Sequence, residues 1–228
     1  MPCKPVLLIM LTLTLCPGLA ETREFRCHGD DEIIVSMERP EGGEAICDAV
    51  GKALGFLSRY DLHPMRAIRI NIVETSISSE GYDAYGSYDI HSEVINLMSY
   101  RAILSSVNQP TMYGEPFDEV HYSGAIAHEV AHAVMHHNLR YKQISQAAQE
   151  YLAHATQLAV LPEDRRNAII KAMNVNPWAT GDAISDVYMA IEPGKFAVKS
   201  YEHLTTMEDP KKFIGILLNS KWFYVYVP

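Results

Sequence analysis

The spacing of apolar residues differs between the two halves of the chain. In the first half, Glu44–Leu57 carries apolar side chains at helical spacing, which predicts a helix with one buried face. Ala67–Ile77 alternates isoleucines with polar residues, a period of two that is typical of a half-buried strand. Glu80–Ile90 is rich in glycine, aspartate and tyrosine, which predicts a turn or hairpin leading to a second strand at Glu93–Met98. The first half is therefore expected to hold a helix and a short sheet.

The second half is patterned for helices alone. Ser123–Asn138 and Ser145–Leu161 are rich in alanine and long apolar residues, and each begins with a serine that can cap a helix. Prolines then divide the rest into segments that fit roughly three or four shorter helices. Strands followed by helices predict an α+β fold. We expect a single domain over residues 21–228, with a small mixed α/β lobe over about 21–138 and an all-helical lobe over about 139–228.

The length and net charge of the chain favour a single globular domain and disfavour some classes of binding partner. The chain has 228 residues, of which 48% are hydrophobic and 21% charged, so one globular domain with a full core is expected. Its net charge of -9 gives no electrostatic basis for binding nucleic acid or anionic membranes. Beyond the N-terminal segment, no apolar run is long enough to span a bilayer. A domain without nucleic-acid partners and without membrane insertion is therefore expected.

The N-terminus has the composition of a secretory leader. The apolar run Val6–Cys16 is too short for a membrane span and fits the hydrophobic region of a signal peptide. Ala20 supplies a small residue at the cleavage position, so residues 1–20 are expected to be removed. One alternative is a lipoprotein attached at Cys16, which the bulky Leu15 disfavours, and another is a buried N-terminal helix. The preferred hypothesis places the mature protein in the periplasm or outside the cell.

Two cysteines remain once the leader is removed, Cys27 and Cys47. In an exported and oxidised chain, this pair is expected to form a disulfide that ties the N-terminal segment to the helix carrying Cys47. Metal binding by the two thiolates is the alternative. It is disfavoured because neither cysteine has a close partner at metal-site spacing.

A metal-binding motif lies within the first of the two long helices. His128 and His132 are one turn apart on one helical face, where both imidazoles can aim a nitrogen at one metal ion. Glu129 stands next to His128, near enough to reach a metal-bound water. Most neighbouring residues are uncharged, so the helix can be buried, and buried imidazoles need partners. Two surface histidines on an amphipathic helix are the alternative interpretation.

A third protein ligand is expected, because a catalytic zinc usually has three such ligands and one open position. The extended motif with a glycine and a third histidine on the same helix is absent, since Met135 and Asn138 occupy those positions. His136 lies a further turn along, too far down the helix axis to share the metal. Glu150 on the next helix has apolar neighbours, which would make an unpaired carboxylate costly and favour it as a ligand. A carboxylate at a solvent-facing helix edge is the alternative for Glu150.

The motif and the distal glutamate together resemble the zincin metallopeptidases, and among them the gluzincin type. The resemblance is strong over Ser123–Leu161 and elsewhere extends only to the order of strands and helices. The chain is also similar to small exported bacterial domains of this type that have no assigned activity. The resemblance implies a zincin-like fold in which one Zn2+ ion is held by His128, His132 and Glu150, with Glu129 as the general base.

The resemblance also carries expectations about the surroundings of the metal. Many gluzincins have an aspartate one turn after the distal glutamate to orient a ligand histidine, and this chain has His154 there. In the family, the strand before the metal helix pairs with an extended substrate, a role that would fall to Glu93–Met98. A tyrosine or histidine from the helical half usually stabilises the oxyanion. Tyr188, Tyr201 and His203 are the candidates, and the sequence gives no choice among them.

The function expected from these residues is that of an exported zinc-dependent metallopeptidase that hydrolyses a peptide or protein substrate. Zinc would acidify a water and Glu129 would take its proton. One rival is a non-catalytic, zinc-containing binding module of the same fold, against which Glu129 argues because a structural zinc needs no base. The other is a metal-free helical interaction domain, against which Glu150 argues. The sequence leaves open the substrate, the oligomeric state and the roles of His136 and His154.

Overall fold

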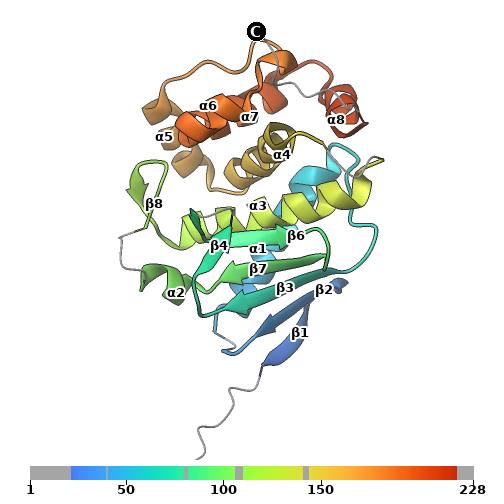
Figure 1. Cartoon of the computed structure of the whole chain (residues 1–228), viewed down its shortest axis with the longest axis vertical. Coiled ribbons are helices and arrows are strands. Elements are labelled where there is room, and N and C mark those ends of the chain that lie inside the picture. Colours follow the sequence, from blue (N-terminus) through green and yellow to red (C-terminus); the bar gives the residue numbers. More distant parts are fainter. Residues whose placement is uncertain (1–21, 40, 80–81, 106–109, 141–143, 220–228) are drawn as a thin grey trace, which may run out of the picture.

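A computed structural model describes residues 22–39, 41–79, 82–105, 110–140 and 144–219 (Figure 1). The leader expected at residues 1–20 lies outside the described residues. The described chain is a mixed α/β fold with a five-stranded sheet, two small hairpin sheets and eight α-helices.

The five-stranded sheet draws all its strands from the first half of the chain. In spatial order they are β1 (Arg23–Cys27), β2 (Asp30–Met37), β3 (Ile68–Val73), β7 (Val94–Met98) and β6 (Gly86–Asp89). The central strands β2, β3 and β7 run parallel to one another. The edge strands are β1, which pairs antiparallel with β2, and β6, which pairs antiparallel with β7. Neither β1 nor β2 was predicted from the sequence.

The strands that the apolar pattern predicted are present with altered bounds. The alternation along β3 is confirmed, since its isoleucines are buried and the residues between them are more exposed. The strand ends at Val73, and Ile77 begins a separate hairpin of β4 (Ile77–Ser79) and β5 (Tyr82–Ala84). The second predicted strand corresponds to β7. The stretch predicted as a turn or hairpin contains both β5 and β6.

Two helices begin where their sequence signals indicated. Helix α1 (Gly43–Ser58) follows a glycine, Gly42, in the left-handed conformation with a φ of 88°, which favours glycine. Helix α4 (Gln146–Ala159) is capped by Ser145, whose hydroxyl accepts a hydrogen bond from the backbone N–H of Ala148. The serine cap predicted for α4 is therefore confirmed.

Helix α3 (Glu119–Asn138) begins a turn earlier than predicted. The carboxylate of Asp118 accepts a hydrogen bond from the backbone N–H of His121 and caps the helix, so the predicted cap at Ser123 is wrong. The Ser123 hydroxyl instead donates to the carbonyl of Glu119 inside the helix. Aspartate caps a helix as well as serine does, and the chain extends the helix to the earlier cap.

Shorter elements complete the described chain. They are α2 (Tyr100–Leu104), β8 (Thr111–Met112), β9 (Glu115–Pro116), α5 (Glu163–Met173), a 3-10 turn (Gly181–Ala183), α6 (Asp186–Ile191), α7 (Pro193–Thr206) and α8 (Pro210–Asn219). Pro162, Pro193 and Pro210 stand at the beginnings of α5, α7 and α8, where the missing proline N–H costs no helical hydrogen bond. The short helices predicted for the end of the chain are confirmed.

Helix α3 lies at the centre of the molecule. In Figure 1 it crosses between the sheet on one side and the C-terminal helices on the other. It packs against α1 and α4 and against strands β6 and β7. Ala127, Val130, Ala131 and Val134 are fully buried, so the burial expected from this uncharged stretch is confirmed. A helix enclosed on several sides holds its polar side chains in fixed directions.

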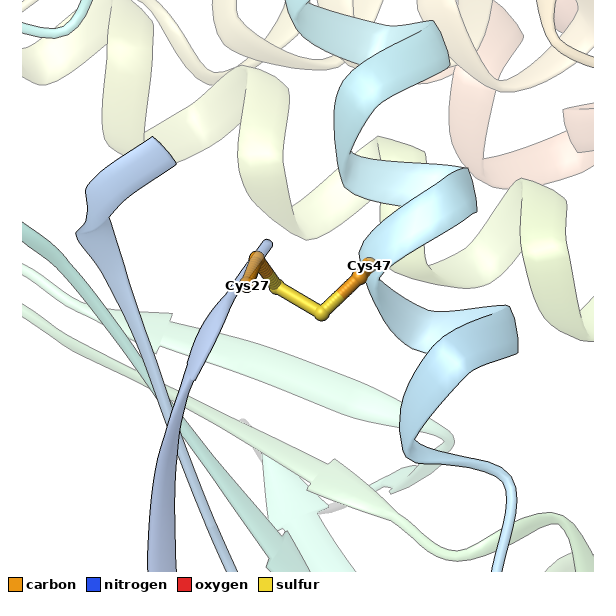
Figure 2. Close-up of a disulfide and its surroundings, with 2 residues drawn as sticks. All are labelled: Cys27 and Cys47. Carbon is orange, nitrogen blue, oxygen red and sulfur yellow. A yellow bond between two sulfur atoms is a disulfide. The ribbon is translucent and has the colours of Figure 1, made fainter. Parts of the chain in front are cut away.

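The predicted disulfide is present. It joins Cys27, at the end of β1, to Cys47 on α1 (Figure 2). The bond thus fastens an edge strand of the sheet to the helix that covers part of the core. Among the described residues, no helix combines the length and the apolar character needed to cross a membrane.

Replacing both Cys27 and Cys47 by serine should lower the free energy of unfolding. The cysteines lie 20 residues apart in the sequence, and opening a loop of about this length costs about 3 kcal/mol in the chain-entropy description. Urea unfolding followed by circular dichroism measures the difference. An unchanged midpoint in the double variant, with the same slope, would contradict a stabilising role for the bond.

Candidate metal centre

Helices α3 and α4 bring three potential metal ligands together. His128 and His132 project from one face of α3, and Glu150 on α4 faces both of them. The ligand atoms of these three residues all lie within 4.8 Å of one another, so the group could hold a metal ion. These three residues are the ligands predicted from the sequence, and the structure places them in one cluster.

The separations within this cluster suit a single ion. The Nε2 atoms of His128 and His132 are 3.1 Å apart. One carboxylate oxygen of Glu150 lies 3.2 Å from His128 Nε2, and the other lies 3.4 Å from His132 Nε2. Ligands bound tetrahedrally at the usual zinc distances lie about 3.3 Å apart. The donor atoms therefore fit around one ion without rearrangement of the helices.

Burial and mutual charge set the protonation of the cluster. Burial alone would lower the pKa of His128, but the neighbouring carboxylates, Glu150 first and Glu129 next, raise this pKa to about 9. Burial would raise the pKa of Glu150, but His132 and His128 hold that pKa well below its usual range. Without a metal at neutral pH, His128 is therefore an imidazolium ion paired with a carboxylate.

Glu129 lies beside this cluster and is nearly enclosed. Its side chain is 8% exposed, and burial raises the pKa of its carboxyl group. A hydrogen bond from the backbone N–H of Tyr88 in β6 and the charges of the two motif histidines oppose this rise. A Cβ atom on Gly86 of β6 would lie 2.8 Å from Cγ of Glu129. Only glycine at this position lets the strand approach the glutamate so closely.

A pocket of about 400 Å³ opens at the cluster. His128, Glu129 and Glu150 line one side of it. The other described walls come from the β5–β6 connection, the β8–β9 hairpin, the start of α7 and further residues of α3 and α4: Ala84, Tyr85, Gly86, Thr111, Met112, Tyr113, Ala125, His154, Gln157, Pro193 and Gly194. The cluster is thus accessible from a cavity large enough for part of a peptide.

The strand expected to pair with a substrate, Glu93–Met98, does not lie at the edge of the sheet. Strand β7 lies between β3 and β6 in the sheet, so both of its sides are paired. The role of pairing with an extended substrate therefore cannot fall to Glu93–Met98, and that expectation is wrong. The edge of the described sheet beside α3 is β6, whose residue Gly86 lines the pocket.

The three candidate oxyanion donors make contacts with residues that do not belong to the described lining of the pocket. The ring of Tyr188 packs against Trp178, and Tyr201 lies under the guanidinium of Arg166. His203 contacts the hydroxyl of Tyr151 through its Nδ1 atom at 2.8 Å. None of these three candidates is among the described residues that line the pocket.

His136 and His154 occupy different surroundings. His136 is outside the three-residue cluster, and its Nδ1 lies 2.9 Å from the hydroxyl of Tyr88. His154 lines the pocket, with its Nε2 3.6 Å from the Glu150 carboxylate. Burial and the positive charge of His128 lower the pKa of His154 to about 4, so its ring is neutral at physiological pH.

The sequence reasoning missed Gln157. Its side-chain oxygen lies 3.0 Å from Nδ1 of His128 and 3.1 Å from Nδ1 of His154. Gln157 is two helical turns after Glu150 and so shares its face of α4. Its spacing from Glu150 was visible in the sequence, but only the structure shows its contact with His128.

Comparison with known proteins identifies a family for this chain, but the family has no assigned activity. A family model described as "Family of unknown function (DUF6639)" matches residues 33–226, so the chain belongs to this family. Neither the curated proteins nor the solved structures give a significant match.

Zinc binding to the metal-free protein should release at least one proton near neutral pH. The proton comes from His128, whose pKa of about 9 keeps it protonated until the metal displaces it. The apparent affinity should therefore increase as the pH rises toward about 9 and then level off. Calorimetric titration in buffers of different ionisation enthalpy measures the release. The same observed enthalpy in every buffer would contradict it.

Proposed function

We propose that this member of the DUF6639 family is an exported, zinc-dependent metallopeptidase of the gluzincin type with a zincin-like fold. The observation that carries the proposal is the position of Glu129. This buried carboxylate lines the same pocket as His128 and Glu150 but is outside the metal-binding cluster. A metal held only for structure needs no such base, so Glu129 favours catalysis over a non-catalytic zinc-containing binding module.

The donor set supports zinc as the metal. Two imidazoles and one carboxylate form the protein ligand set of several known catalytic zinc sites. When bound, the ion would lower the pKa of a coordinated water and polarise a substrate carbonyl. The cluster supplies three protein ligands, and the adjoining pocket gives a water and a substrate access to the remaining position.

Glu129 has the surroundings of a general base. Burial raises the pKa of its carboxyl group, which increases its affinity for the proton that the attacking water must lose. The backbone N–H of Tyr88 holds the carboxylate from the side of the sheet. In the proposed reaction, Glu129 takes this proton and delivers it to the amine that leaves when the peptide bond breaks.

The edge strand β6 offers a place for an extended substrate. The carbonyls of Tyr85 and Asp89 accept hydrogen bonds from Met98 and Glu93, on the side of β7. Because bonding directions alternate along an antiparallel strand, the backbone groups of Gly86 and Tyr88 face the open side. The Tyr88 N–H already binds Glu129 there. We therefore propose that substrate backbone pairs with Gly86, next to the base and the metal ligands.

The disulfide supports the exported location. Disulfides persist in oxidising compartments and are rare in the cytosol. The bond between Cys27 and Cys47 therefore fits a protein that is secreted or periplasmic after removal of residues 1–20.

The test of the function is a Glu129→Gln variant. The amide cannot take the proton of the water, so turnover should fall by several orders of magnitude, on the order of 1,000-fold or more. Zinc content and thermal unfolding should remain close to those of the parent, because Glu129 is outside the metal-binding cluster. A broad peptide library with mass-spectrometric detection measures cleavage by both proteins. Equal cleavage would refute the base assignment, and no cleavage by either would favour the binding module.

The third ligand is tested by Glu150→Ala. Loss of its carboxylate leaves two imidazoles, so zinc affinity should fall sharply and the zinc-loaded protein should melt at a lower temperature. His136→Ala is the control, since this histidine lies on α3 like the two motif histidines but contacts the hydroxyl of Tyr88. Competition with a zinc chelator measures both affinities. If Glu150→Ala binds zinc like the parent and the control does not, the third ligand is a histidine and the gluzincin assignment fails.

A further inference from the structure

A single buried amide touches two histidines of the pocket. The side chain of Gln157 is 4% exposed, and its Oε1 atom lies near Nδ1 of both His128 and His154. On its other side, the amide nitrogen lies 2.9 Å from the sulfur of Met112 in the β8–β9 hairpin. Gln157 therefore has a defined contact at each end of its amide.

These contacts fix which end of the amide is the oxygen. A thioether sulfur only accepts hydrogen bonds, so the NH2 group belongs on the side of Met112. The carbonyl oxygen then faces the two rings, and its two lone pairs can accept one hydrogen bond from each. His128 and His154 consequently both carry a proton on Nδ1.

This arrangement is the one that the metal cluster requires. In His128 the Nε2 atom faces Glu150 and His132, so Nε2 must carry the lone pair that binds a metal. The opposite amide orientation would place N–H donors against Nδ1 and move the ring proton to Nε2, which would block coordination. By accepting a hydrogen bond from Nδ1, the carbonyl oxygen of Gln157 thus leaves Nε2 of His128 free to bind a metal ion.

The side chain of Gln157 is held in place by its packing. A Cβ atom on Gly124, one turn before His128 on α3, would lie only 3.2 Å from Cγ of Gln157. The absence of a side chain at Gly124 makes room for the glutamine between the two helices. With its stem against α3 and its amide against Met112, Gln157 has little freedom to turn away from the histidines.

We propose that Gln157 is the positioning residue of the candidate metal centre: its carbonyl oxygen accepts from Nδ1 of both His128 and His154, which directs Nε2 of His128 toward the metal position and Nε2 of His154 toward Glu150. The proposal rests on the proposed function for its metal. The resemblance to gluzincins led us to expect an orienting aspartate one turn after Glu150, where this chain has His154. Gln157 takes over that task one further turn along α4, and it serves two rings instead of one.

Three variants test this role. Gln157→Met keeps the approximate shape but replaces the carbonyl oxygen by a thioether sulfur, which accepts hydrogen bonds only weakly, and Gln157→Glu keeps an oxygen acceptor. Thr156→Val is the matched control, because Thr156 is also buried on α4 and its hydroxyl donates to the carbonyl of Leu152, not to a histidine. Chelator competition gives the zinc affinity, and nitrogen-15 NMR of the histidine rings gives the tautomers in zinc-loaded and metal-free protein.

Gln157→Met should lower zinc affinity by about 10- to 100-fold and move the proton of His154 toward Nε2, the position preferred in free histidine. Gln157→Glu and Thr156→Val should keep the affinity within a few-fold and leave the Nδ1–H form of His154 in place. Unchanged tautomers and affinity in Gln157→Met would overturn the proposal. If that variant does not fold, an Nε2–H form of His154 in Gln157→Glu would overturn it instead.

The proposed function and the positioning role of Gln157 can be tested separately. If the parent protein binds no zinc, the metallopeptidase proposal is wrong. The ring of His154 in the metal-free protein still decides the role of Gln157: a tautomer that changes in Gln157→Met and not in Thr156→Val supports positioning, and one that stays the same contradicts it.

Discussion

The packing of α3 against α4 is the interaction on which the candidate metal centre depends. Ala127 and Ala131 on α3 and Ala147 and Ala148 on α4 are buried, and such small side chains let the helix backbones approach closely. The same approach brings Glu150 against the two motif histidines, where an unpaired carboxylate would be costly. A metal ion bound by these three partly buried groups would compensate their desolvation together.

The sheet and the β8–β9 hairpin both contribute residues to the site. Gly86 lets β6 approach Glu129, and Gly124 leaves room for Gln157. Met112 of the hairpin then contacts the amide of Gln157. Glu129, the proposed base, is therefore contacted by the edge strand, and His128 is contacted by Gln157 of α4. Each polar side chain that the proposed reaction uses has a partner on a different element, which is the condition for a preorganised site.

Local patterns predicted the helices and the three residues of the candidate metal cluster, whereas contacts between residues distant in sequence were missed. The histidine pair is set by the helical repeat alone, and Glu150 was identifiable because its neighbours are apolar. Strand β6 was taken as part of a turn, because Gly86 and Asp89 are turn formers and strand order depends on pairing between segments. Gln157 was missed since an amide carries no metal-ligand signal, and its role appears only when α3 lies against α4. The oxyanion candidates were chosen by residue type, which does not locate a side chain in a pocket.

The central claim is that one zinc ion is bound by His128, His132 and Glu150, and zinc-edge X-ray absorption of the purified protein tests it most directly. The account predicts one zinc per chain with nitrogen and oxygen ligands at about 2.0–2.2 Å and the outer-shell scattering of two imidazole rings. A protein that takes up no zinc, or a spectrum that shows sulfur ligands or three imidazoles, would contradict it.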